Sequence, residues 1–118
     1  MIGLLENHVP ANVVCAFNDA NSSCRELVDP EVIAQCERRL RATLMLRADE
    51  VAPSDAFETA LMELCDHFAL DVGAISDEHI RNLRQRLDDE GIHALLNAIY
   101  LTDMRVRLEL VAKEIFKA

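Results

Sequence analysis

The stretch that decides the fold is residues 88–116, which read DDEGIHALLNAIYLTDMRVRLELVAKEIF. Apolar side chains recur there every three or four residues, which is the spacing of an α-helix. They form two rows: the first holds Ile92, Leu95, Leu96, Ile99, Val106 and Leu110, and the second holds Leu101, Met104, Leu108, Val111 and Ile115. Two rows make a stripe wider than the single buried face of a surface helix. We therefore expect this helix either to be central in the fold or to meet another subunit.

Helix start signals precede this segment at three places. Asp29-Pro30-Glu31 reads as N-cap, first-position proline and first-turn acid, and predicts a helix that ends near Ala48. Ser54, after Pro53, is the expected cap of the next helix, which Asp71-Val72-Gly73 should break. Ser76-Asp77-Glu78 then predicts a further short helix before the last one.

The N-terminal residues carry weaker signals. Pro10 followed by ANVVCAF predicts a short helix, and the polar run NDANSSC predicts a loop or a helix end. We therefore expect a single domain over residues 1–118, with an N-terminal arm and short helix over 1–28 and a helical core over 29–118. The predicted fold class is all-α, a compact orthogonal bundle of about five helices.

Composition supports this class and limits the partners. Hydrophobic residues make up 51% of the 118-residue chain and aromatic residues 4%, with only 3 Gly and 3 Pro, which favours helices with an aliphatic core. The formal net charge of −9 disfavours binding to nucleic acid and to anionic membranes. No apolar run approaches the roughly 20 residues of a membrane span. The start MIGLLENHVP has no basic region typical of a signal peptide, so the expected location is cytoplasmic.

The cysteines are Cys15, Cys24, Cys36 and Cys65, and no C-x-x-C is present. Cys36 and Cys65 lie on apolar helical rows, where a small buried hydrophobe is the expected role. The alternative is a reactive Cys36 thiolate, with Arg38 or Arg39 lowering its pKa. A disulfide between Cys15 and Cys24 stays open. The cysteine spacing resembles no zinc-binding pattern, so no metal site and no cofactor is predicted.

A few polar residues are candidates for a site. His67 shares a helical face with Glu63 and could contact a substrate, although a solvated ion pair is the simpler interpretation. Asp103 lies in the first apolar row of the last helix, where Arg107 is its expected partner. The cluster of Arg38, Arg39 and Arg41 could receive an anionic ligand, but pairing with the protein's own carboxylates is the preferred interpretation.

Two runs in the second half resemble a known family. FETALMELCDHFALDVGAISDEHIRNLRQ (57–85) and IHALLNAIYLTDMRVRL (92–108) look like the C-terminal part of alkylhydroperoxidase D-like proteins, in the carboxymuconolactone decarboxylase superfamily. The match rests on helix patterning and caps: Ala69-Leu70-Asp71, Ser76-Asp77-Glu78, Leu83, Tyr100 and Arg105 stand where that family carries comparable residues. It covers about half of the chain.

The resemblance implies an all-helical fold that assembles into dimers, trimers or hexamers. It also implies thiol peroxidase chemistry, but that activity relies on a C-x-x-C with a nearby histidine, and here the corresponding stretch reads CERRLRATLMLR. No redox residue of the family can be carried over. The expected function is thus a non-redox member of the superfamily, a structural or binding protein that forms a homo-oligomer through its C-terminal helix.

The alternative function is an enzyme of the decarboxylase or peroxidase type, acting on a small molecule in a pocket between helices or subunits. Its weak catalytic candidates are Cys36 and His67, and its weak ligand-binding candidates are Arg105, Asp103 and Tyr100.

Overall fold

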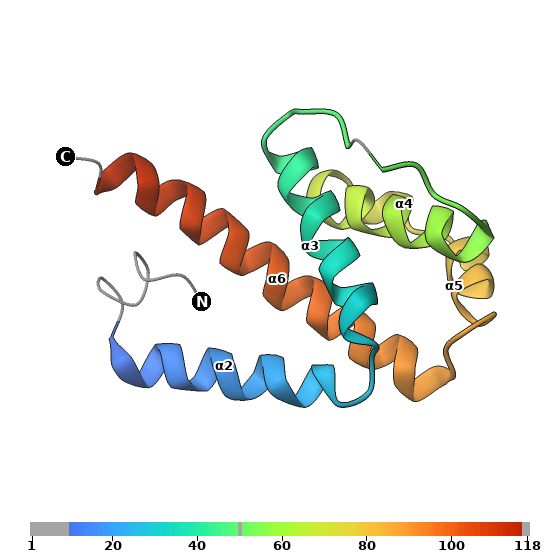
Figure 1. The fold of residues 1–118 in the computed structure, drawn as a ribbon, viewed down its shortest axis with the longest axis horizontal. Coiled ribbons are helices and arrows are strands. Elements are labelled where there is room, and N and C mark those ends of the chain that lie inside the picture. Colours follow the sequence, from blue (N-terminus) through green and yellow to red (C-terminus); the bar gives the residue numbers. More distant parts are fainter. Residues whose placement is uncertain (1–9, 50, 117–118) are drawn as a thin grey trace.

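The computed structural model describes residues 10–49 and 51–116, and every segment of regular structure in those residues is helical. The elements are α2 (Ala11–Arg25), α3 (Pro30–Leu44), α4 (Ala56–Leu70), the 3-10 helix η1 (Val72–Ala74), α5 (Asp77–Leu83) and α6 (Asp89–Ile115). Five α-helices in the described part of the chain confirm the all-α prediction. Figure 1 shows α6 as the long diagonal helix against which the others gather.

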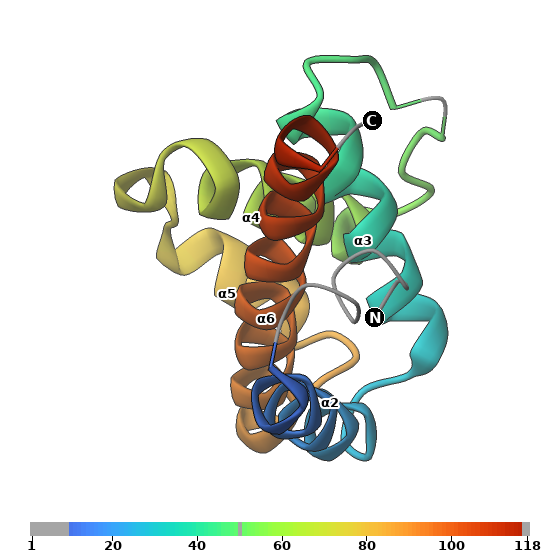
Figure 2. The same cartoon turned by 90° about the vertical axis from the view of Figure 1, so that its left-hand side faces the viewer.

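Helix α6 is about 40 Å long at 1.5 Å per residue, and it packs against α2, α3 and α4. Helices α3 and α4 also pack against each other, and α5 covers part of α4. Figures 1 and 2 agree that α2 lies beside the first half of α6 and diverges from its second half. Among the described elements, α2 therefore packs beside the first half of α6 and not beside the second.

The core is aliphatic and lies where α3, α4 and α6 meet. Its fully buried members include Ile33, Leu40, Leu61, Leu64, Leu95 and Ile99, with Phe57 at the start of α4 and Leu83 on α5. The first apolar row of α6 faces this core: Ile92, Leu95, Ile99 and Val106 are buried, while Leu96 and Leu110 are half-buried. The prediction that α6 is central is confirmed.

Helix starts follow the cap signals, with one correction. The carboxylates of Asp29 and Asp88 accept backbone N–H groups at the starts of α3 and α6. Ser76 forms a capping box with His79 at the start of α5. The expected cap Ser54 is wrong: α4 begins at Ala56, so Asp55 is its N-cap, and the Asp55 carboxylate accepts the N–H of Glu58 at 2.8 Å.

Two predictions about helix length were wrong. The run NDANSSC, expected to be a loop or a helix end, forms the C-terminal half of α2, so the helix is longer than the predicted ANVVCAF segment. Phe17 and Cys24, seven residues apart, are buried on one face, and their packing overrides the low helix propensity of the polar residues between them. Helix α3 ends at Leu44, four residues before Ala48, because Leu46 adopts a left-handed φ of 55°. The N–H groups of Leu46 and Arg47 then bond to the Thr43 and Ala42 carbonyls, which completes a Schellman end.

In the described residues, no helix combines the length and the apolar character that crossing a membrane requires.

Candidate functional site

The predicted catalytic candidates Cys36 and His67 have different surroundings. Cys36 is buried in the core beside Cys65, and the hydrogen bond between the two thiols, together with burial, raises the pKa of the Cys65 thiol well above its usual range. Both act as small core residues, as expected. The His67 ring lies 5.3 Å from that of His79, centroid to centroid, and Glu63 bonds to His79 rather than to His67. The expected Glu63–His67 pair is therefore wrong.

The contacts of His79 at the start of α5 hold its imidazole ring in one tautomer. Its Nδ1 accepts the backbone N–H of Ser76 at 3.0 Å, so the ring proton is on Nε2, which donates to the Glu63 carboxylate at 2.9 Å. A metal bound through Nε2 would need the proton on Nδ1 and would break this cap. The described residues contain no group of three or more His, Cys, Asp or Glu arranged to hold a metal ion.

The arginine cluster of α3 pairs with the protein's own carboxylates, as expected. Arg39 makes two hydrogen bonds to Asp66 on α4, at 2.8 and 2.6 Å, and Thr43 donates to the same carboxylate at 2.7 Å. Burial acts to raise the pKa of Asp66, but the hydrogen bonds from Arg39 and Thr43 outweigh it and hold that pKa below its usual value. These bonds fix α3 against α4.

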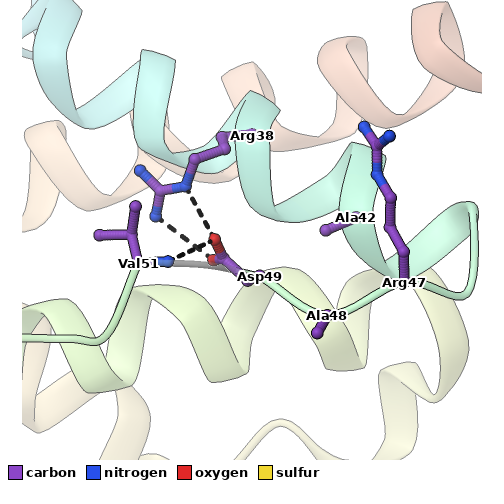
Figure 3. Close-up of a pocket in the computed structure, with 6 residues that line it drawn as sticks. All are labelled: Arg38, Ala42, Arg47, Ala48, Asp49 and Val51. Carbon is purple, nitrogen blue, oxygen red and sulfur yellow. Dashed lines mark hydrogen bonds and ion pairs between the residues drawn. The ribbon is translucent and has the colours of Figure 1, made fainter.

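A hollow beside this cluster is lined by Arg38, Ala42, Arg47, Ala48, Asp49 and Val51. Figure 3 shows the Arg38 guanidinium turned onto Asp49, with a bond of 3.1 Å from Nε, while the Arg47 side chain extends away from that pair. Asp49 also accepts the N–H of Val51 at 3.2 Å. The Arg38–Asp49 pair closes the loop that follows α3. The guanidinium groups of Arg38 and Arg47 do not converge on one point, so the hollow does not have the geometry of an anion site.

A four-membered ring of charges joins α3 to α6. Glu109 of α6 is 1% exposed, and its two carboxylate oxygens accept from Arg41 at 2.6 Å and from Arg105 at 3.0 Å. Glu37 closes the ring, bonded to Arg105 and, at 3.3 Å, to Arg41. Burial acts to raise the pKa of Glu37, but its bonds to Arg105 and Arg41 hold the pKa below its usual value.

Arg105, a predicted ligand contact, is thus engaged by two carboxylates. Glu109 was missed by the sequence reading, although it lies one turn from Arg105 on the buried side of α6. That combination of an i, i+4 charge pair with a buried helix face is the signal that could have found it.

The remaining candidates lie at the opposite side of α6. Asp103 pairs with Arg107 at 3.0 Å, as predicted, and Arg107 also donates to the Ala69 carbonyl at the end of α4. Tyr100 is exposed and meets the Phe68 ring edge-on, with centroids 6.1 Å apart.

Four members of the second apolar row of α6 are exposed, as is Tyr100 beside them, while the fifth member, Leu101, is half-buried. Tyr100, Met104, Leu108, Val111 and Ile115 are all exposed. At 100° per residue they fall within about 80° of the helix circumference, over a length of about 22 Å. We call these five residues the α6 stripe. Monomeric proteins rarely leave a contiguous apolar strip of this kind in water.

A second hollow adjoins the stripe between α2 and α6. It is lined by Ala20, Ser23 and Cys24 of α2 and by Asn97, Tyr100 and Leu101 of α6. Burial raises the pKa of the Cys24 thiol. Cys15 and Cys24 are both free and lie nine residues apart on one helix, about 13 Å along its axis, which is too far for a disulfide.

No family model matches the chain, and neither a curated protein nor a solved structure shows significant similarity to it. The resemblance to alkylhydroperoxidase D-like proteins thus stays a prediction from sequence. The site must be judged on its geometry. In the described residues every buried side-chain nitrogen and oxygen has a hydrogen-bond partner, so the polar clusters are mutually satisfied. The α6 stripe, by contrast, is a row of exposed apolar side chains along one helix.

Proposed function

We propose that the chain is a structural or binding protein that forms a homo-oligomer through the α6 stripe. The main support for this proposal is the division of α6 into two apolar rows, one largely buried in the protomer and the other largely exposed. A second copy is the favoured occupant because both copies carry the same stripe, as a two-fold interface requires. A non-redox scaffold of the alkylhydroperoxidase D-like kind, built to assemble, would fit this role.

The apolar area suits a reversible dimer. The exposed parts of Met104, Leu108, Val111 and Ile115 amount to about two complete side chains, whose burial stabilises by about 3–6 kcal/mol per copy. For two copies this is about 6–12 kcal/mol, to which Tyr100 adds, against an association cost of roughly 4–15 kcal/mol. The gain and the cost are of similar size, so we expect a reversible dimer that dissociates on dilution.

The enzyme alternative is less well supported by the same observations. Arg105 is held by two carboxylates and Cys36 is buried in the core, so neither is available to a substrate. The polar groups that would have to converge on a substrate instead hold helices together.

Sedimentation equilibrium tests the proposal with a matched pair of variants. Leu108 in the stripe is 47% exposed, and Leu27 beyond the end of α2 is 50% exposed, so Leu108→Glu and Leu27→Glu add the same charge at equally exposed leucines. We expect the parent chain and Leu27→Glu to be dimeric at about 100 µM and Leu108→Glu to be monomeric. A monomeric parent chain, or equal effects of the two substitutions, would refute the proposal.

A further inference from the structure

We infer that two copies pair antiparallel along α6 and that Ile115 of each copy fills the hollow between α2 and α6 of the other. This inference rests on the proposed function and adds the orientation, register and socket of the assembly. It begins from the spacing of the α6 stripe. Counted from Tyr100, the stripe residues follow at intervals of 4, 4, 3 and 4, a pattern that is almost unchanged when read backwards.

Reversal about a centre near Leu108 sets Tyr100 opposite Ile115 and Met104 opposite Val111. Leu108 then faces its own counterpart across the two-fold axis. Each large side chain of the stripe therefore meets an apolar partner in this antiparallel register.

The helix dipoles disfavour the parallel alternative, because two parallel helix dipoles side by side are less favourable than two opposed ones.

The position of α2 gives a second, independent reason. Helix α2 flanks the first half of α6 and diverges from the second half, as Figures 1 and 2 show. An antiparallel pair places the second half of each α6 against the half of the other that α2 flanks. The hollow between α2 and α6 then lies where the C-terminal turns of the second copy arrive.

The hollow has the form of a socket for one side chain. Asn97, Tyr100, Leu101 and Met104 stand at i, i+3, i+4 and i+7 on α6, the four positions that form a hole in knobs-into-holes packing. Asn97, Tyr100 and Leu101 line the hollow, and Ala20, Ser23 and Cys24 of α2 form its side wall. The register above directs Ile115, which is 66% exposed, at this hole.

Cysteine cross-linking tests this arrangement, because Cys24 is a native thiol in the socket wall. The background carries Cys15→Ser, which removes the exposed thiol and keeps the buried ones. Single substitutions Leu108→Cys, Tyr100→Cys and Ile115→Cys are then oxidised with copper(II)–phenanthroline in folded protein. Each disulfide forms when two thiols lose two protons to the solvent and two electrons to two copper(II) ions.

We expect Leu108→Cys to link to itself across the two-fold axis and Tyr100→Cys not to. Ile115→Cys should form a dimer joined through Cys24, identified by mass spectrometry of the linked peptides. Adding Cys24→Ser should abolish the Ile115→Cys dimer and leave the Leu108→Cys dimer intact.

Self-linked Tyr100→Cys or Ile115→Cys dimers would indicate parallel pairing and overturn the inference. An Ile115→Cys dimer that persists with Cys24→Ser would also overturn it, as would an unlinked Leu108→Cys variant that sedimentation shows to be dimeric. A parent chain that is monomeric in sedimentation would instead refute the proposed function, so failure of the inference and failure of the proposed function are distinguishable.

Discussion

Replacement of Glu109 by glutamine should destabilise the protein by about 2–3 kcal/mol. Glu109 is 1% exposed and serves both Arg41 and Arg105. Removal of one partner from a buried ion pair costs about 3–5 kcal/mol, because a charge is left uncompensated. The lower value follows here because Arg41 is about one-quarter exposed, at 26%, and Glu37 still binds both guanidinium groups.

Urea unfolding followed by circular dichroism measures this change. With a slope of about 1–3 kcal/mol per molar urea, the midpoint should fall by roughly 0.7–3 M. Asp103→Asn is the matched control, because Asp103 also accepts a hydrogen bond from an arginine four residues along α6. That arginine, Arg107, is about half exposed. Loss of this pair should cost under about 1 kcal/mol. Equal destabilisation by the two substitutions would show that burial of Glu109 does not set its contribution.

Three further predictions follow from the same contacts. The pKa values of Glu37, Asp49 and Asp66 are held below their usual values in the folded protein, since their hydrogen bonds to arginines outweigh burial. The stability that these carboxylates contribute is therefore present above their unfolded pKa values of about 4, and it is lost as the pH falls through their folded pKa values. The melting temperature should therefore decline from pH 7 to pH 3, and a constant melting temperature would contradict this prediction. Alkylation at neutral pH should label the exposed Cys15 first and the buried Cys24, Cys36 and Cys65 slowly, and rapid labelling of Cys36 would instead support a reactive thiolate. Leu46→Gly should stabilise by about 0.5–1 kcal/mol, because Leu46 has a φ of 55° and is 90% exposed; a loss of stability in urea would mean that this side chain makes a contact worth more than its strain.

Much of the helical framework can be predicted from local signals. Caps such as Asp29 and Ser76 act within one turn, so their residue types predict helix starts directly. The two rows of α6 are also visible in the sequence, because helical periodicity alone brings their members together. Which row is buried could not be predicted, since that depends on where α3 and α4 pack.

The misses share a physical cause, which is tertiary contact. The polar stretch of α2 is helical because Phe17 and Cys24 are buried beside it, and no propensity within that stretch indicates this. Glu109 looks like any surface glutamate until Arg41, 68 residues away, is placed against it. The α2–α6 hollow likewise depends on packing between segments far apart in the chain.

The position of Tyr100 makes the protein its own optical reporter. The chain contains one tyrosine and no tryptophan, so all of its tyrosine emission arises from a side chain that is exposed on the α6 stripe and borders the hollow beside α2. Any event that covers this face changes the surroundings of the single fluorophore, with no dye attached. The corollary is weak absorbance at 280 nm, so protein concentration is better followed through the peptide bond.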